Sequence, residues 1–494
     1  MLTHIPGDDA VKSTAQSSKA RGFKARAAAA LSDANLQLAL ARARGGFVRK
    51  REIAMDALPE FEALRETARA IEEHTLSHLD LYLERFESEV VESGGHVHWA
   101  RTSFDARGII TEICTRARAR RVVKGKSMIG EEIAINQALM DAGFEVTETD
   151  LGEYIIQLAR ETPSHIIAPA VHKTRDDIAR LFREHHAKHG FGERGAEVPD
   201  LVDEAREVLR DIFLMADVGI TGANFLIAET GSNVLVTNEG NGDLTCTLPR
   251  VHIVLASIDK VIPTFEDATV FLRLLARSAS GQVMSSYTTF STGPRRKGDR
   301  DGDLDGPEEY HVVLIDNGRS EILGTPYRDI LHCIRCGACL NHCPVYGAIG
   351  GHAYGWVYPG PMGAVLTPLL DGRADAWDLP NACTLNGRCE EVCPLGIPLP
   401  ALLRRLRTEA FRRKAAPSGV RTSLWIWGFF ARHPWLYGHL TTLGMAILRR
   451  IGRRRKLLDA LPFLRPWTQS RDLAVPRGET FQAKWRRQRE EEIS

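Results

Sequence analysis

Two short runs hold seven of the chain's nine cysteines: Cys333-Ile-Arg-Cys336-Gly-Ala-Cys339-Leu-Asn-His-Cys343-Pro344 and Cys383-Thr-Leu-Asn386-Gly-Arg-Cys389-Glu-Glu-Val-Cys393-Pro394. The first run has the spacing of bacterial ferredoxins, in which three neighbouring thiolates hold one [4Fe-4S] cluster and the fourth cysteine ligates another cluster. Zinc sites more often use two separated cysteine or histidine pairs. The two runs therefore predict an α-helical, ferredoxin-type domain with two iron-sulfur clusters.

Crossed ligation divides the seven cysteines between the two clusters. Cluster I is predicted to be a [4Fe-4S] cluster held by four thiolates, those of Cys333, Cys336, Cys339 and Cys393. Cluster II receives three, those of Cys343, Cys383 and Cys389, because Asn386 stands where a full second motif would have a cysteine. Cluster II is therefore expected to be a [3Fe-4S] centre, a [4Fe-4S] centre with solvent or an external ligand on its fourth iron, or a labile cluster.

The composition is that of a globular chain with two to four domains. Its 494 residues include 64 Lys and Arg against 63 Asp and Glu, so the net charge does not suggest a nucleic-acid partner. The N-terminal region lacks the positively charged start and the following apolar run of an export signal, so no export signal is expected. Only Cys114 and Cys246 lie outside the two runs, and both are interpreted as buried core thiols. Cysteine clusters of this kind favour a reducing, cytoplasmic location.

Four segments follow from the patterning of the chain. Residues 1–92 form a helical N-terminal segment, residues 93–325 an α/β domain, residues 326–400 the ferredoxin-type domain, and residues 401–494 a basic helical tail. In the α/β domain, amphipathic stretches alternate with short apolar runs at residues 122–123, 144–147, 155–159, 165–169, 224–229, 233–237, 251–255 and 310–314. Such alternation predicts a mainly parallel sheet covered by helices. A polar loop is expected at residues 295–308.

The tail combines strong positive charge with aromatic residues. Residues 401–456 contain fourteen Lys or Arg and one acid, Glu409, and they include the apolar run Leu424-Trp-Ile-Trp-Gly-Phe-Phe430. Arg432, His433 and Pro434 interrupt this run before it is long enough to span a bilayer. Docking to a partner protein, contact with a membrane surface and packing within the chain are the alternatives for this region.

Three blocks of sequence resemble the lactate-utilisation protein B family, the iron-sulfur subunit of a bacterial lactate-oxidising system of three proteins. The first block runs from Val122 through Glu148-Thr-Asp-Leu-Gly-Glu153 to His172, and the second from Gly219 to Gly242. The third consists of the two cysteine runs with Pro359-Gly-Pro361 between them. Together with Pro476-Arg-Gly-Glu-Thr-Phe481, the resemblance covers nearly everything after residue 50.

The resemblance implies a LUD-type α/β domain like those of sugar-phosphate isomerases and CoA-transferases. It also implies a role in oxidising L-lactate to pyruvate, as a subunit of an iron-sulfur dehydrogenase complex that passes electrons toward a membrane or quinone-linked acceptor. The implied partners are a cysteine-rich CCG-domain protein and a second LUD-domain protein. Two positions depart from the family pattern: Asn386 replaces a cysteine, and Asp243 stands where arginine is expected.

The α/β domain also contains candidates for catalysis. Glu229 and Glu239 lie in glycine-containing segments that can form turns at strand ends, where backbone amides can face an anion. Either carboxylate could act as a base on a small carboxylate, with Lys126, His165 or His172 as partners. Alternatively, these residues close turns and cap helices. The rival function is accordingly a small-carboxylate-binding or acyl-transfer module whose clusters sense redox state or serve structure.

Two cofactor motifs are absent. Gly125-Lys126-Ser127 resembles the end of a phosphate-binding loop, but the required earlier glycine is replaced by Arg120. No GxGxxG motif follows a predicted strand, so the sequence offers no sign of NAD or FAD. Residues next to the cysteines can influence the clusters. The charge of Arg335 and the backbone amides of Gly337 and Gly387 can tune the reduction potentials of the clusters.

Overall fold

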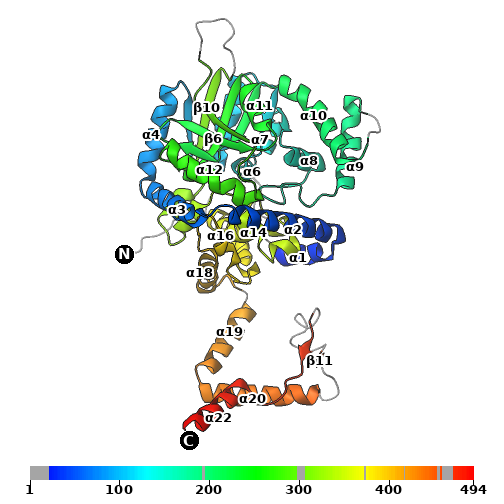
Figure 1. Cartoon of the computed structure of the whole chain (residues 1–494), viewed down its shortest axis with the longest axis vertical. Helices are drawn as coiled ribbons and strands as arrows, with labels where there is room; N and C mark the ends of the chain where they lie inside the picture. Colours follow the sequence, from blue (N-terminus) through cyan, green and yellow to red (C-terminus); the bar gives the residue numbers. More distant parts are fainter. Residues whose placement is uncertain are drawn as a thin grey trace. The chain divides into compact units, whose positions relative to one another are not determined.

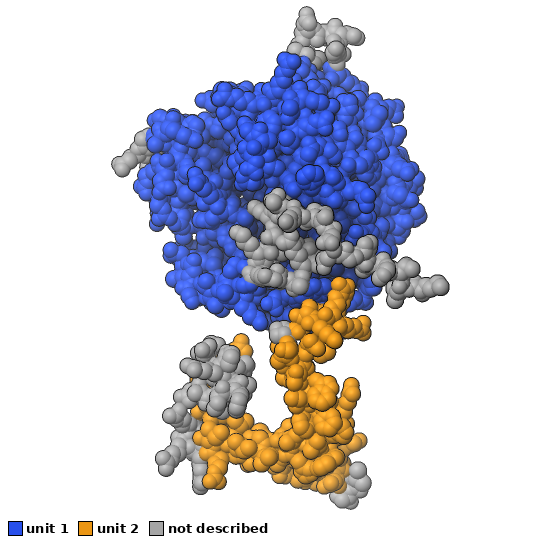
Figure 2. All heavy atoms as spheres, turned by 180° about the vertical axis from the view of Figure 1, so that it is seen from behind, with its two compact units in different colours: residues 1–408 blue, residues 409–494 orange. Residues whose placement is uncertain are grey.

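The computed structural model describes residues 22–191, 195–296, 306–371, 374–416, 418–452, 457–458 and 471–493. The chain divides into two compact units, residues 1–408 and 409–494 (Figure 2). The first unit contains both cysteine runs and the α/β domain. Most of the polar loop predicted at residues 295–308 lies outside the described residues.

A six-stranded sheet forms the centre of the first unit (Figure 1). All of its strands are parallel, as the sequence predicts. In spatial order they are β1 (His96–Ala100), β10 (Glu309–Ile315), β7 (Val251–Ser257), β4 (Val218–Gly222), β2 (Arg121–Lys124) and β3 (Glu145–Glu148). Every residue of β7 and β4 is buried, because a parallel sheet has helices on both faces.

Alternate residues of these strands enter two different cores. Ile253 and Val313 face one core, which is closed by the helices α5 (Ser103–Arg116), α6 (Met128–Glu132) and α7 (Ile135–Asp141). Val254 and Val312 face the other core, which also contains α3 (Phe61–Ser77), α4 (Leu79–Glu92) and α12 (Phe265–Ser280). This second core continues into the cysteine domain, where it includes Cys336. The α/β and cysteine domains therefore share one hydrophobic core.

A smaller mixed sheet packs beside the parallel one. Its strands are β8 (Val261–Ile262), β5 (Phe225–Ile227), β6 (Ser232–Thr237) and β9 (Tyr287–Ser291) in spatial order, and β6 is antiparallel to both of its neighbours. The remaining helices of the domain are α8 (Leu151–Ala159), α9 (Arg175–His186), the 3₁₀ turn η1 (Ala187–His189), α10 (Val198–Leu214), α11 (Asn241–Thr247), η2 (Ile258–Lys260) and α13 (Arg319–Leu323). Helices α8, α9 and α10 enclose a small core of their own.

Two of the apolar runs do not form strands. Residues 155–159 lie in α8, which Asp150 caps by accepting a 3.1 Å hydrogen bond from the backbone N–H of Glu153. Residues 165–169 form an irregular segment. Periodicity cannot separate a short buried helix from a buried strand when the run is apolar on all sides, and Tyr154, Ile155 and Ile156 are all buried.

Four helices precede the sheet: α1 (Phe23–Ser32), α2 (Ala34–Asp56), and then α3 and α4. Helix α2 packs on α12 of the α/β domain and on the cysteine domain (Figure 1). Gln37 Nε2 donates to the carbonyl oxygen of Ala348 at 2.8 Å, and Arg51 Nη2 donates to that of Val392 at 2.9 Å. One long helix thus holds the two domains together.

Short helices separated by glycines build the cysteine domain. They are η3 (Arg328–His332), α14 (Ala338–Asn341), α15 (Tyr346–Ile349), η4 (His352–Tyr354), α16 (Gly360–Asp371), η5 (Ala374–Ala382), α17 (Arg388–Glu391) and α18 (Leu399–Arg412). Each cysteine run contains a helix of one turn, α14 or α17, which begins after a glycine with positive φ. The helical character predicted for this domain is confirmed.

The second unit contains α19 (Ser418–Ala431), α20 (Pro434–Ile451), the strand pair β11 (Leu457–Leu458) and β12 (Leu473–Ala474), and α22 (Phe481–Ile493). None of the residues of α19 and α20 is buried, and the indoles of Trp425, Trp427 and Trp435 are exposed. No helix in the described part of the chain combines the length and apolar character needed to cross a bilayer.

Candidate iron-sulfur sites and adjoining pocket

The four cysteines assigned to cluster I line one cavity. Cys333 and Cys336 reach it from the loop before α14, Cys339 from α14 itself, and Cys393 from the turn after α17. The other lining residues are mainly apolar: Ile166, Ile334, Gly337, Met362, Pro394, Leu395, Ile397 and Leu399. All four thiols are free. Four convergent thiols in an apolar setting fit the donor set of an iron-sulfur cluster.

Burial keeps several of these thiols neutral while no cation is bound to them. It raises the pKa of Cys336, and it raises the pKa of Cys393 to about 11. Two cations hold the backbone around them: Lys260 Nζ donates to the carbonyl oxygen of Cys333 at 2.9 Å, and Arg65 Nε donates to that of Cys393 at 3.0 Å. The loop at Cys333 is therefore held by the α/β domain, and the turn at Cys393 is held by α3.

The three cysteines assigned to cluster II also lie near one another. Burial raises the pKa of Cys389 to about 12, and the neighbouring thiols of Cys383 and Cys343 add to this rise. Backbone N–H groups point at two of the sulfurs: that of Leu385 donates to Cys383 Sγ at 3.2 Å, and that of Tyr346 donates to Cys343 Sγ at 3.4 Å. Hydrogen bonds of this kind stabilise a thiolate ligand and tune a cluster's potential.

Asn386 occupies the place in the second loop that Cys336 has in the first. Both loops have positive φ at the residue before this position and at the glycine after it, 59° and 75° at Arg335 and Gly337, and 56° and 87° at Leu385 and Gly387. Asn386 is exposed, and its Oδ1 accepts a 3.3 Å hydrogen bond from the backbone N–H of Arg388. The amide thus closes the turn at the position of the missing thiol.

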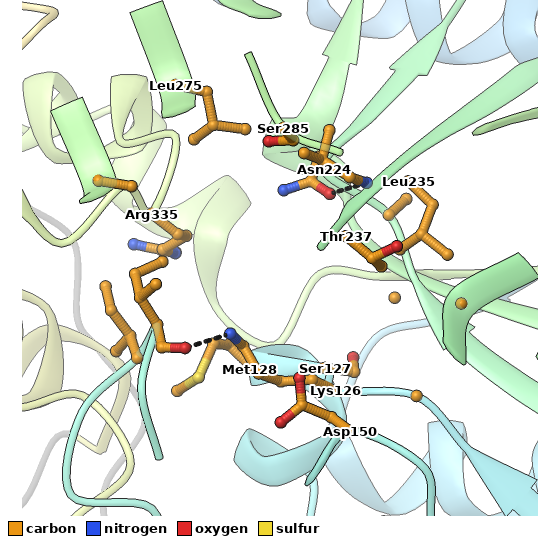
Figure 3. A pocket seen from close by; sticks show the side chains of 18 of the residues that line it. Lys126, Ser127, Met128, Asp150, Asn224, Leu235, Thr237, Leu275, Ser285 and Arg335 are labelled. Atoms are coloured by element: carbon orange, nitrogen blue, oxygen red, sulfur yellow. Dashed lines mark hydrogen bonds between the residues drawn. The ribbon is translucent and has the colours of Figure 1, made fainter. Parts of the chain in front are cut away.

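A pocket of about 250 Å³ lies between the α/β domain and the cluster I loop (Figure 3). Gly125, Gly222 and Ser257 line it from the carboxyl ends of β2, β4 and β7. Ile334 and Arg335 line it from the cluster I loop. The carboxyl edge of a parallel sheet is where α/β proteins bind their ligands. Here that edge borders a cysteine loop.

Two of the five α/β candidates line this pocket. Lys126 Nζ donates to the carbonyl oxygen of Ile167 at 2.8 Å, which places the ammonium at the pocket wall (Figure 3). Glu239 Oε2 accepts a 3.3 Å hydrogen bond from the backbone N–H of Leu151. Burial raises the pKa of Glu239, and the nearby carboxylate of Asp150 raises it further. A carboxylate with a raised pKa is better suited to exchange protons near neutral pH.

Glu229 and His165 have structural contacts. Glu229 Oε2 accepts a 2.9 Å hydrogen bond from the backbone N–H of Phe265, at the start of α12. His165 is buried, and burial lowers its pKa to about 4. Its Nδ1 accepts from the backbone N–H of Ile167 at 3.0 Å, and its Nε2 donates to Asn341 Oδ1 at 3.0 Å. Neither side chain lines the pocket.

His172 belongs to a separate group of possible metal ligands. One ligand atom from each of Glu161, His172 and His352 lies within 4.8 Å of the others. His172 Nε2 is 2.7 Å from Glu161 Oε2, and the Nδ1 of His172 is buried without a hydrogen-bond partner among the described residues. Lys173 Nζ lies 2.5 Å from the second oxygen of the Glu161 carboxylate. An ion bound here would replace the contact between His172 and Glu161, while Lys173 occupies the other carboxylate oxygen.

A buried network of charges that no sequence motif indicates lies behind the pocket. Arg319 Nη2 lies 2.7 Å from Glu132 Oε2, and its Nε lies 2.9 Å from Asp259 Oδ1. The Glu132 carboxylate also accepts a 2.6 Å hydrogen bond from the hydroxyl of Tyr358 in the cysteine domain. Lys260 Nζ completes the set at 2.8 Å from Asp259 Oδ2. Apart from the neighbours Asp259 and Lys260, these residues lie far apart along the chain, and they share no motif.

Comparison with known proteins agrees with this arrangement. The LUD domain family model matches residues 83–315, and the 4Fe-4S dicluster domain model matches residues 329–397. The dicluster match and the cysteine geometry together identify an iron-sulfur protein.

Three relatives match nearly the whole chain. An uncharacterized electron transport protein YkgF of Escherichia coli (strain K12) is 42% identical over 95% of this chain and 97% of its own. Lactate utilization protein B of Bacillus pumilus (strain SAFR-032) is 41% identical over 96% and 98% of the two chains. The protein of that name from Shouchella clausii (strain KSM-K16) is 43% identical over 95% and 97%. The chain therefore belongs to the lactate utilization protein B family.

Proposed function

We propose that the chain is the electron-transfer subunit of a complex that oxidises L-lactate to pyruvate and delivers the electrons toward a membrane or quinone-linked acceptor. The observation that supports this most is the placement of two sets of cysteines in one compact domain. Cys333, Cys336, Cys339 and Cys393 line one cavity, and Cys343, Cys383 and Cys389 lie near one another beside it. Helix α14 carries Cys339 of the first set and helix α17 carries Cys389 of the second, and the two helices pack on each other.

The first four cysteines would hold a [4Fe-4S] cluster, and the other three would hold a [4Fe-4S] or a [3Fe-4S] cluster. When bound, such clusters accept and release single electrons. The protein's own groups set how readily this happens. Backbone N–H groups at the Cys343 and Cys383 sulfurs stabilise negative charge there. The apolar lining of the first cavity excludes water from its thiols.

The family names suggest the remaining parts of the complex. We propose that a cysteine-rich CCG-domain protein and a second LUD-domain protein are the partners. The second unit of the chain offers a surface for docking: α19 and α20 present exposed tryptophans, and basic residues such as Arg449 and Arg450 end α20. Tryptophan with arginine also suits the interface of an anionic membrane, so we propose that the cytoplasmic protein touches the inner face of the cell membrane there.

Anaerobic EPR of the full chain tests the proposal. The clusters are reconstituted with iron and sulfide, and spectra are recorded before and after L-lactate is added, with and without the partner proteins. We expect two paramagnetic centres that L-lactate reduces only in the complex. Clusters that remain oxidised in the complete complex, although dithionite reduces them, would contradict the proposed relay.

One observation favours a second function, in which the clusters sense redox state and the α/β domain binds a small carboxylate or transfers an acyl group. Asn386 is exposed at the position of the missing thiol, where a cluster would be open to solvent. A sensor would lose or regain cluster II reversibly without any partner protein. A Cys336→Ser change would then leave ligand binding by the α/β domain intact, whereas it would stop lactate-dependent electron flow through a relay.

A further inference from the structure

Arg335 belongs to the cluster I loop, but its side chain does not line the cysteine cavity. It lies between Cys333 and Cys336, and its backbone has φ of 59°. The guanidinium lines the neighbouring pocket, opposite Asn224 and Thr237 (Figure 3). The residue that joins two cluster ligands therefore also forms a wall of the ligand-sized pocket.

The guanidinium of Arg335 has donors to spare. Its side chain is only 14% exposed, and it lies over the ring of Tyr358 at 5.0 Å from the ring centre. Its Nη1 donates to the sulfur of Met362 at 3.5 Å, and its Nη2 is 3.9 Å from Asp259 Oδ2. Within the part of the chain that the structure describes, it donates to no oxygen at hydrogen-bonding distance.

Asp259 cannot satisfy this arginine, because two closer cations already hold its carboxylate. Lys260 Nζ is 2.8 Å from Asp259 Oδ2, and Arg319 Nε is 2.9 Å from Asp259 Oδ1. An arginine carries five N–H donors in a planar fork that matches a carboxylate. A largely buried arginine with unused donors at the wall of a pocket is therefore suited to hold an oxyanion.

The rest of the pocket suits a small polar molecule. Lys126 supplies a second cation, and Ser127, Asn224, Thr237 and Ser285 supply hydroxyl and amide groups (Figure 3). The volume of about 250 Å³ is slightly below the usual range for ligand pockets, so it suits a small metabolite better than a dinucleotide. Asp150 and Glu239 also line the pocket and can accept a hydrogen bond from a hydroxyl.

We propose that this pocket binds a small 2-hydroxy or 2-oxo carboxylate, with the carboxylate group on the guanidinium of Arg335. This inference rests on the proposed function, and it assigns to this chain the site for the small acid. It also has an electrostatic consequence. An anion on Arg335 offsets the positive charge next to cluster I, so binding makes cluster I harder to reduce.

Binding to the full chain with reconstituted clusters tests the proposal. Isothermal titration with pyruvate, with L-lactate and with inorganic phosphate is compared among the wild type, Arg335→Lys, Arg335→Gln and Arg120→Gln. Arg120 is a matched control, because it precedes β2 at the opposite edge of the sheet and pairs with Glu145. Iron content is measured for each variant.

We expect pyruvate or L-lactate to bind the wild type and Arg120→Gln equally. Arg335→Gln should weaken binding about 10- to 100-fold, the effect of losing hydrogen bonds from a charged group. Arg335→Lys should fall between them. Bound pyruvate should lower the midpoint potential of cluster I in the wild type and leave it unchanged in Arg335→Gln.

Equal binding by Arg335→Gln, no binding by the wild type, or equal affinity for phosphate would each overturn the proposal. If the Arg335 variants do not retain iron, binding is measured in Lys126→Gln, which changes the pocket from the side of the α/β domain. Unchanged affinity for pyruvate or L-lactate in that variant would also overturn the proposal. Failure of the relay is a distinct result, in which pyruvate binds through Arg335 but L-lactate reduces neither cluster in the full complex.

Discussion

The two cysteine loops, residues 333–339 and 383–389, have the same backbone turn and different surroundings. Each has positive φ at its third and fifth residues and then begins a one-turn helix. The first loop is packed against the α/β domain, and its central cysteine is buried. The second loop is more open, and an exposed asparagine replaces that cysteine. The comparison suggests that the turn is a common scaffold, and that its environment decides which cluster is protected.

Removing the central thiol of the first loop should have the largest effect. We expect Cys336→Ser to abolish lactate-dependent reduction in the complex and to lower the iron content, because cluster I loses a ligand in a water-poor cavity. EPR and iron analysis measure both. Cys246→Ser is the control, since the Cys246 sulfur lies outside both loops and donates to the carbonyl oxygen of Asp243, a bond that a hydroxyl can keep. Normal reduction in Cys336→Ser would show that cluster I is not on the electron path.

Supplying the missing thiol should make the second loop resemble the first. Asn386→Cys places a fourth sulfur on a backbone that already has the required turn. If cluster II is a [3Fe-4S] centre, we expect iron to rise by about one atom per chain and the oxidised [3Fe-4S] signal to disappear. The same iron content and spectrum as in the wild type would mean that the thiol does not reach the cluster.

Chelation should separate the two sites by their exposure. When the holoprotein is oxidised and treated with a chelator, we expect iron to leave in two phases, with cluster II lost first because its loop is open to solvent at Asn386. EPR during the reaction identifies which signal disappears in each phase. Simultaneous loss of both signals would indicate that the shared core, rather than each loop's exposure, protects the clusters.

A pair of glycine substitutions gives the smallest expected effect and the closest comparison. Gly337→Ala and Gly387→Ala both force alanine into positive φ, which costs about 1–2 kcal/mol. An added Cβ at Gly337 would lie 3.1 Å from Ile167 Cγ1 and 3.4 Å from His165 Cε1, whereas at Gly387 it meets nothing within 4 Å. Gly337→Ala should therefore reduce the free energy of unfolding more, by about a further 1–3 kcal/mol.

Anaerobic denaturant unfolding of the two glycine variants measures this difference. Both should be compared with the wild type at equal iron content, because bound clusters stabilise the folded state. Equal destabilisation would mean that the first loop can move away from the α/β domain without cost.

The sequence was most informative where chemistry depends on spacing. The cysteine intervals predicted which four thiols meet, because ferredoxin ligation follows a fixed pattern, and alternation of apolar and amphipathic runs predicted the parallel sheet. Spacing could not reveal the pocket, because Lys126 and Arg335 are far apart in the sequence and only the fold brings them to the same pocket. Glu229, a candidate base in the sequence, lies outside this pocket, and its carboxylate accepts a hydrogen bond from the backbone N–H of Phe265 at the start of α12. The apolar runs at residues 155–159 and 165–169 resembled strands in the sequence, but the first lies in helix α8 and the second, which begins at His165, is irregular.

Helix α2 also bears on how the chain reaches its native state. Arg51 donates to the carbonyl oxygen of Val392, a residue made much later during synthesis. Until the ribosome has passed the second cysteine run, this buried arginine lacks its partner, and the early helix cannot settle on the cysteine domain. Contacts between such distant parts of a chain form slowly. Completion of folding in the nascent protein is therefore tied to the stage at which the last cysteines become available for cluster assembly.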